Sequence, residues 1–256
     1  MRRYSWRDDQ WERVEHLLPG KESDPGVTAK DKRLFVEAVL YRYRAGIPWR
    51  DLPERFGDFR VVHTRQTRWS EKGVWQSVFD VLAEDADNEY AAIDATIVRA
   101  HQHRAGAKKK TSDTCETQAR GRSRGGLSTK IHATCDALGN PTGFHLTPGQ
   151  AHDLQGADVL LVQIDEIGAL LADKAYDAEQ RVLERRKEAG CQAVIPPKSH
   201  RTEHREYDEQ MYTWRHLIEN LFQKLQQYRA LATRDEKTAR HFLGAIYLAA
   251  TVIWLH

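Results

Sequence analysis

The chain has 256 residues, of which 40% are hydrophobic and 30% charged, and its formal net charge is +2. This composition supplies enough apolar residues for a core and excludes a wholly disordered chain. The three cysteines are widely spaced and form no Cys-x-x-Cys pair, so they predict neither a disulfide framework nor a cysteine zinc site and favour the reducing cytoplasm. The longest apolar run, residues 245–255, is shorter than the ~20 residues that cross a bilayer, so we expect no membrane partner.

The first part of the chain has the pattern of a small helical domain. Apolar residues recur there at helical spacing, and a capping box over residues 28–31 opens a predicted helix over 30–45. A further helix begins at Asp58 and is followed by an amphipathic segment. These elements predict an all-helical, helix-turn-helix-like domain over residues 1–86, joined to a second domain over 87–256.

The helix that follows Asp58 is the candidate DNA reader of this domain. It carries Arg60, Arg65 and Arg68, together with His63 and Gln66, on what we expect to be one face. A short helix with such donors can reach base edges and phosphates in a major groove. The alternative is a charged helix that only faces solvent.

The second part of the chain alternates strands and helices. We expect strands over residues 90–98, 129–135, 141–146, 169–172 and 192–195, and helices over 153–163, 177–189, 209–228 and 237–254. A Gly-Asn turn joins the second and third strands as a hairpin. The order predicts an α/β fold with a mixed five-stranded sheet and flanking helices.

Positive charge gathers in a predicted basic loop over residues 99–130. From Arg99 to His132, nine Lys and Arg residues stand against two acidic ones, a net charge of +7. Such a charge density suits a polyanion, so Arg122, Arg124 and Lys130 are candidate DNA contacts. The alternative is a solvated loop that only aids solubility.

Three carboxylates are candidates for chemistry. Asp94 and Asp173 lie in or at the end of apolar strands, where an unpaired carboxylate is costly, so each has a cationic partner or both bind a cation. Glu219 adjoins the apolar stripe of a predicted helix, where Arg215 and Tyr212 precede it by four and seven residues and share its face. An ordinary Arg–Glu surface pair is the alternative.

Carboxylates that converge from two strands and a helix suit a hard cation with oxygen ligands, Mg²⁺ or Mn²⁺. Two such ions ~3.5–4 Å apart can activate the attacking oxygen and stabilise the leaving oxygen of a phosphoryl displacement. The pattern therefore favours nuclease and strand-transfer chemistry. Histidine–zinc catalysis is disfavoured because the sequence has no His-Glu-x-x-His motif.

At these residues the chain resembles bacterial insertion-sequence transposases of the DDE type, in the group named for insertion sequence five. The resemblance covers nearly the whole chain, and its motifs together are highly specific. They lie at residues 44–57 (RAGIPWRDLPERFG), 93–96 (IDAT), 121–132 (GRSRGGLSTKIH), 147–153 (TPGQAHD), 172–177 (ADKAYD) and 232–237 (ATRDEK).

The resemblance implies a ribonuclease H-like catalytic fold. It implies that Asp94, Asp173 and Glu219 form the catalytic, metal-binding triad, and that two ions occupy each active site. It also implies that Tyr212 and Arg215, in the family signature Tyr-x2-Arg-x3-Glu-x6-Lys, hold the DNA end.

The chain departs from this signature at its last position, where Gln226 replaces the family's Lys. A neutral amide can hydrogen-bond a phosphate but cannot neutralise it, so we expect weaker binding of the DNA end, with Lys224 an imperfect substitute from another helix face. His152 and Asp153 match a family motif and are secondary candidates near the metals. A turn cap is the alternative for both.

Together these features predict a DNA transposase of the bacterial cytoplasm, associated with the nucleoid. The N-terminal helices would bind the terminal inverted repeats of the element, and the triad would cleave its ends and join the 3′-hydroxyls to target DNA. One active site must process each end, so we expect a homodimer that bridges two ends. Two alternatives stay open: a structure-specific nuclease without strand transfer, and a DNA-binding repressor, which Gln226 favours.

Overall fold

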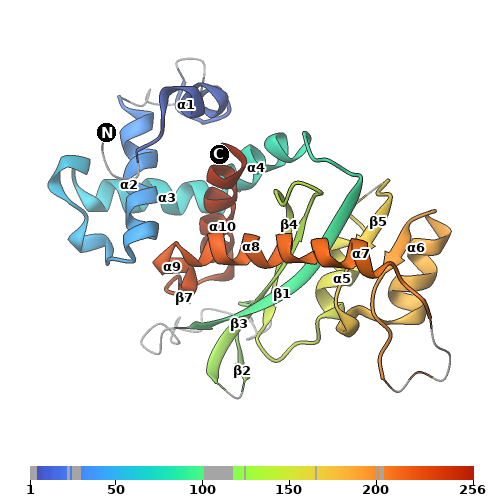
Figure 1. The fold of residues 1–256 in the computed structure, drawn as a ribbon. Helices are drawn as coiled ribbons and strands as arrows, with labels where there is room; N and C mark the ends of the chain where they lie inside the picture. The colour runs from blue at the N-terminus through green and yellow to red at the C-terminus, as the bar shows by residue number, and fades with distance from the viewer. Residues whose placement is uncertain are drawn as a thin grey trace.

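A computed structural model describes residues 5–21, 24, 30–100, 118–123, 125–164, 166–199, 201 and 205–256 (Figure 1). Most of the predicted basic loop, Arg124 included, lies outside the described residues. The described chain forms a mixed sheet with helices against both faces, and its N-terminal region is helical (Figure 1). The predicted α/β class, with a helical region before a mixed sheet, is confirmed.

The sheet has seven strands among the described residues, where five were predicted. The long strands β1 (Tyr90–Ala100), β3 (Gly126–Cys135) and β4 (Pro141–Pro148) are antiparallel neighbours in the order β1-β3-β4. The short strands β5 (Ala169–Leu171) and β6 (Gln192–Val194) continue the sheet beyond β1 and run parallel to it. These five match the predicted strands.

The two strands that were not predicted lengthen the sheet at one end. β2 (Gly121–Ser123) pairs with the start of β3, and β7 (Thr233–Arg234) pairs with the end of β1. Strands of three and two residues are too short to show an alternating pattern, and only their partners define them. β1 and β3 also extend further than predicted, which shortens the predicted loop between them.

The N-terminal helices are α1 (Asp8–Glu15), α2 (Lys32–Ala45), α3 (Phe59–Glu71) and α4 (Val74–Ala83), with 3₁₀ turns at Trp49–Asp51 and Glu54–Phe56. Asp31 is itself the N-cap of α2 and accepts the Leu34 amide at 2.7 Å, so this helix begins two residues later than predicted. Asp58 caps α3 in the same way. Gly46 ends α2 at φ +68, a conformation that favours glycine.

The helices of the α/β region are α5 (Leu154–Leu160), α6 (Glu184–Glu188), α7 (Glu209–Tyr212), α8 (His216–Gln226), α9 (Arg229–Ala232) and α10 (Ala239–Trp254). The predicted helix over 209–228 is divided, because a 3₁₀ turn at Thr213–Arg215 separates α7 from α8. The predicted helix over 177–189 begins later, with π-helical geometry over Glu179–Leu183. Asp177 does not cap it, because its carboxylate accepts the Lys198 amide and the Arg201 guanidinium.

One hydrophobic core joins the N-terminal helices to the sheet. α10 packs between them (Figure 1), where the Phe79 ring of α4 lies 5.1 Å from that of Tyr247 in α10 and 5.7 Å from that of Phe144 in β4. A second cluster covers the opposite face of the sheet under α5. The predicted division at residue 86 stays a prediction, and the two parts share this core. No helix in the described ranges is both long and apolar enough to span a bilayer.

Candidate active site

The predicted aspartates lie at equivalent levels of two neighbouring parallel strands. In the register of β1 and β5, Ala92 is opposite Leu171, and Asp94 and Asp173 each follow two residues later. Because side chains alternate along a strand, this spacing directs both aspartates toward the same face of the sheet. Both are half-buried. The parallel pairing of two short apolar segments therefore brings together carboxylates that are 79 residues apart in the chain.

Arg215 joins Asp94 to Glu219. One guanidinium nitrogen, Nη1, donates to Asp94 Oδ2 at 2.6 Å, and the other, Nη2, donates to Glu219 Oε1. Arg215 ends the 3₁₀ turn before α8, and α8 lies against β1 and β3, so the helix carries Arg215 and Glu219 to the strand that holds Asp94. The Arg–Glu pair is therefore not isolated at the surface, because the same guanidinium binds a strand aspartate.

Each aspartate also binds a backbone amide close to it in sequence. Asp94 Oδ1 accepts the Ala95 amide at 2.7 Å, and Asp173 Oδ1 accepts the Ala175 amide at 2.8 Å at the start of the 3₁₀ turn Lys174–Tyr176. One oxygen of each carboxylate thus has an amide donor that orients it.

The charges at this site perturb one another. Burial raises the pKa of Asp94, and the charge of Asp173 raises it further, against the Ala95 amide and Arg215, which lower it. Burial lowers the pKa of Arg215, but the charges of Asp94, Tyr212 and Glu219 outweigh it and leave that pKa raised. The guanidinium therefore offsets only part of the cost of holding the Asp94 carboxylate in a half-buried position beside a second acid.

The donor set suits a hard divalent cation, because Asp94, Asp173 and Glu219 offer only carboxylate oxygens. In the described part of the chain, however, no three His, Cys, Asp or Glu side chains stand close enough to hold a metal ion as the structure is. The positive charge shared by Asp94 and Glu219 here is the Arg215 guanidinium. A cation bound by all three acids would have to replace those contacts.

The other residues of the predicted signature lie along α7 and α8. The Arg215 guanidinium lies 5.9 Å from the centroid of the Tyr212 ring. Gln226 and Lys224 are both exposed near the end of α8. Gln226 is seven residues after Glu219, about two helical turns along the same face of α8. Lys224, five residues after Glu219, is rotated about 140° around the helix axis from Glu219. Lys224 is therefore a poor substitute for a lysine at position 226.

The candidate DNA-reading helix α3 is only partly as predicted. Arg60 and Arg68 are exposed, whereas the Arg65 guanidinium lies over the rings of Phe35 and Trp69, at 4.3 and 4.9 Å from their centroids. Gln66, placed on the same exposed face by the prediction, is buried. Its amide donates to the hydroxyls of Tyr43 and Ser70 and accepts from the Trp75 indole, because the helix turns this position toward the core.

The three candidate DNA contacts of the predicted basic loop differ in exposure and in whether the structure describes them. Arg122 is exposed on β2, while Arg124 lies outside the described residues. Lys130 is buried, and its ammonium donates to the Ala151 carbonyl at 2.6 Å and to Asp153 Oδ1 at 2.8 Å. Lys130 therefore has an internal ion pair, because its position in β3 points toward the start of α5, and its contact with DNA stays a prediction.

His152 and Asp153, the secondary candidates before α5, have different contacts in the structure. The His152 ring accepts the Leu154 amide at 3.2 Å, which fits the turn-cap alternative. The Asp153 carboxylate instead accepts the Lys130 ammonium. Asp153 also acts electrostatically on Tyr176, a residue that sequence reasoning did not single out. The only signal for that tyrosine was its place in the 172–177 motif.

The chain is similar to known protein families over most of its length. Residues 86–255 match the family described as "Transposase DDE domain", and residues 7–79 match the one described as "Putative transposase of IS4/5 family". The chain belongs to the DDE transposases. Family membership implies a metal-dependent enzyme that acts on DNA, and DDE domains generally use divalent metal ions.

Two relatives show what this transposase is similar to. It is 50% identical over 103 residues to "Uncharacterized protein y4sN" of Sinorhizobium fredii, a match that covers 40% of the chain and 82% of the relative. It is 37% identical over 131 residues to "Putative transposase for insertion sequence element IS6501" of Brucella ovis, which covers 50% of the chain and 99% of the relative. No solved structure matches the transposase.

The transposase motif at residues 232–237 has a structural role. Arg234 is buried and donates to the Ala119 carbonyl at 3.1 Å and to Thr129, while Glu236 Oε1 accepts the buried Arg42 guanidinium at 2.7 Å. Burial, with the nearby charge of Arg120, lowers the pKa of Arg234 to about 9. This network connects α2, through Glu236 and the neighbouring β7, to Ala119 before β2 and to Thr129 in β3.

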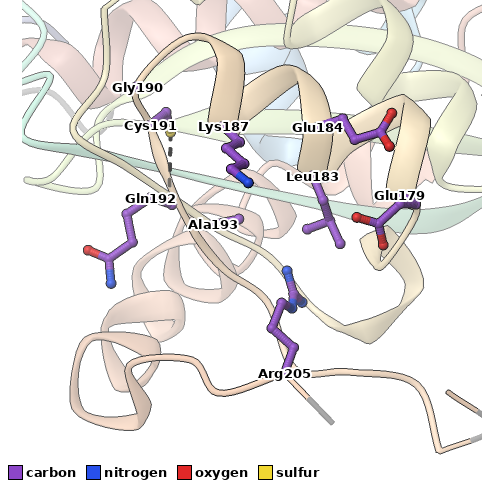
Figure 2. Close-up of a pocket in the computed structure, with 9 residues that line it drawn as sticks. All are labelled: Glu179, Leu183, Glu184, Lys187, Gly190, Cys191, Gln192, Ala193 and Arg205. Carbon is purple, nitrogen blue, oxygen red and sulfur yellow. Dashed lines mark hydrogen bonds between the residues drawn. The ribbon is translucent and has the colours of Figure 1, made fainter. Parts of the chain in front are cut away.

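A separate cavity of about 690 Å³ lies at the far edge of the sheet, beside β6 and α6 (Figure 2). Figure 2 shows two acidic residues, Glu179 and Glu184, and two basic ones, Lys187 and Arg205, around it. The Cys191 thiol at its wall has a raised pKa because it is buried, which disfavours the reactive thiolate. Among the described residues, no predicted site residue of the transposase lines this cavity.

Proposed function

We propose that this transposase binds the terminal inverted repeats of its element, cleaves the element ends and joins their 3′-hydroxyls to target DNA. Asp94, Asp173 and Glu219 would hold two divalent ions, Mg²⁺ or Mn²⁺, at each active site. The observation that carries this proposal is the shared guanidinium: Arg215 binds carboxylates from β1 and α8, and the charge of Asp173 reaches the same site. Two of the three acids, 125 residues apart in the chain, thus share one positive charge.

The bound ions supply activation of the attacking oxygen and neutralisation of charge on the leaving oxygen. In the first reaction the oxygen of water bonds to the scissile phosphorus and the bond to the 3′-oxygen breaks, which frees the 3′-hydroxyl of the element. In the second, that hydroxyl bonds to a target phosphorus and displaces the target's 3′-oxygen. Once other cations neutralise its carboxylate partners, Arg215 can donate N–H hydrogen bonds from both terminal nitrogens of its guanidinium to a phosphate.

The DNA partner would be double-stranded and would contact several basic surfaces. Arg60 and Arg68 on α3 and Arg122 on β2 are exposed, and Gln226 can hydrogen-bond a phosphate near Glu219. Lysine and arginine contacts release counterions, so the affinity for DNA should fall steeply with salt. A homodimer would bring two element ends together, and the work would take place at the nucleoid.

The experiment supplies a labelled element-end duplex and a supercoiled target plasmid with Mg²⁺. We expect joined products with the wild-type chain and none with Asp94→Asn, Asp173→Asn or Glu219→Gln, each of which should still bind the duplex. Asp85→Asn, at an exposed position, is the matched control and should join normally. Undiminished joining by Asp94→Asn would reject the assignment.

The same assay separates the two alternatives. Cleaved but unjoined ends would identify a structure-specific nuclease. Binding without any Mg²⁺-dependent nicking would identify a repressor, the outcome that the neutral Gln226 favours. Each result contradicts strand transfer at a different step.

A further inference from the structure

Val61 is an apolar residue that α3 presents to solvent, at 66% exposure. Valine has a lower helix propensity than most straight-chain residues, so the stability of the helix does not account for its presence there. Single apolar residues are common on protein surfaces, and the neighbours of Val61 therefore decide what it can contact. Those neighbours are basic and polar side chains of the same helix.

The face that α3 turns outward is fixed by the packing of its other face. Gln66 and Trp69 are buried against the core, and the Gln66 amide donates to the Tyr43 hydroxyl at 3.2 Å. At about 100° per residue, Thr64 lies near the centre of the opposite face, and Val61 lies about 60° from it. Both residues are exposed, in the first two turns of the helix.

Positive charge surrounds these two residues. Arg60 and Arg68 are exposed and lie about 40° to either side of Thr64. α3 carries no acidic residue before its last position, Glu71. The acid that precedes the helix, Asp58, acts as its N-cap and accepts the Arg60 amide at 2.8 Å. The outward face of α3 therefore combines cations and a hydroxyl with one apolar side chain.

This combination matches the chemical groups of the major groove of DNA. Guanidinium groups bind phosphates and the acceptor atoms of guanine, and a threonine hydroxyl can pair with either donors or acceptors on the bases. The apolar group that the major groove presents is the C5-methyl of thymine. A branched apolar side chain between arginines is suited to bury that methyl group while the arginines hold the helix in the groove.

We propose that Val61 recognises a thymine in the terminal inverted repeat through its C5-methyl group. The inference rests on the proposed function, because it takes α3 as the helix that binds the repeats. Contacts from Arg60 and Arg68 to phosphates support binding to any duplex. The contact from Val61 favours a thymine at one position, so this residue contributes to sequence specificity.

The test replaces the thymines of the element-end duplex one at a time with deoxyuridine, which removes the methyl group and keeps every hydrogen-bonding group of the base. Affinity of the full-length chain is measured in EDTA by fluorescence anisotropy. We expect the wild type to prefer the element end over a scrambled duplex and to bind about 3–5-fold more weakly when one particular thymine is replaced, the effect of one buried methyl group.

Val61→Ala identifies the protein side of the contact. Because the position is exposed and alanine is a good helix former, the variant should melt no lower than the wild type. It should bind the unmodified duplex more weakly and be indifferent to deoxyuridine at the sensitive position. Val81→Ala, at 43% exposure on α4, is the matched control and should keep both the affinity and the deoxyuridine response of the wild type.

The arms of the experiment separate the two levels of the argument. If the wild type binds the element end no better than the scrambled duplex, recognition of the terminal repeats fails, and this inference fails with it. Selective binding that no deoxyuridine weakens refutes the methyl contact alone. A Val61→Ala variant that keeps the wild-type deoxyuridine response also overturns the inference, because another residue must then contact the methyl group.

Discussion

The substitution Arg215→Met tests the geometry of the site most directly, because it removes the charge shared by Asp94 and Glu219 and keeps a side chain of similar length. The contact with Asp94 joins side chains that are 19% and 21% exposed, at 2.6 Å. The contact with Glu219 involves a carboxylate that is 51% exposed and four residues away on the helix. The first contact is therefore expected to dominate the energetics.

A hydrogen bond to a charged group contributes ~1.5–3 kcal/mol when its partners are shielded from water. An exposed i,i+4 pair contributes only ~0.3–0.5 kcal/mol. Without Arg215, Asp94 keeps its burial and the repulsion of Asp173 but loses its counterion. We expect the variant to lose about 2 kcal/mol of unfolding free energy at neutral pH in EDTA, nearly all of it from the Asp94 contact.

Divalent cations should reverse this loss. A ligand that binds only the folded state stabilises it by ~2.7 kcal/mol at a hundredfold excess over its Kd. In the wild type a cation must first displace the guanidinium, and in Arg215→Met it need not. The gain in stability on adding Mg²⁺ should therefore be larger in the variant than in the wild type.

The assay is urea unfolding in EDTA and in Mg²⁺, with Arg181→Met as the control. Arg181 forms a surface pair with Asp158, in which the side chains are 43% and 41% exposed, so its removal should cost ~0–1 kcal/mol and give no response to Mg²⁺ beyond that of the wild type. An Arg215→Met variant as stable as the wild type in EDTA, or one with no larger gain from Mg²⁺, would refute the reasoning.

Three further predictions follow from the same structure. The folded-state pKa of Asp94 is raised, so ionising this carboxyl destabilises the folded protein, and the free energy of unfolding should fall as the pH rises from about 4 through that pKa. Urea unfolding of Asp94→Asn at several pH values should lack this fall. An identical pH profile in the variant would contradict the argument from burial. Arg42→Met should lose ~3–5 kcal/mol in the same assay, because it leaves the Glu236 carboxylate without its counterion. Glu236→Gln should lose less, because the amide oxygen can still accept the hydrogen bond from Arg42; equal losses would show that the charge of Glu236 matters and the hydrogen bond alone does not, and would contradict this expectation. Gln226→Lys should bind an element-end duplex more tightly, and the salt dependence of its affinity should steepen by about one counterion, as measured by fluorescence anisotropy. The control is Gln227→Lys, at a neighbouring exposed position on another helix face, which should have a smaller effect. Equal effects would show only a non-specific gain of positive charge.

Local patterns in the sequence were sufficient wherever a segment carries its own signal. The acidic caps Asp31 and Asp58 lie directly before their helices, and the turn before Asn140 forms the predicted hairpin between β3 and β4. Apolar runs of four to nine residues identified the five main strands, since each must bury at least one face. The acids Asp94 and Asp173 stood out for the same reason, because a carboxylate in an apolar strand is conspicuous.

Tertiary contacts decided what no local pattern could carry. β2 and β7 exist only because the ends of long strands pair with them, and the break between α7 and α8 is not marked by proline or glycine. The sequence alone assigned Lys130 and Gln66 to surfaces, but each is buried with a partner from elsewhere in the fold. A polar residue's partner is set by which segments pack together.

The site shows the same division. Sequence by itself singled out Asp94, Asp173 and Glu219 as candidates for the chemistry. It also placed Arg215 on the same helix face as Glu219, because helical spacing is a local property. Only the fold decided that Arg215 also reaches Asp94, 121 residues away, and that the buried Tyr176 hydroxyl has no hydrogen-bond partner among the described residues. Long-range electrostatics and burial depend on the packing of whole elements, and that packing is a property of the complete chain.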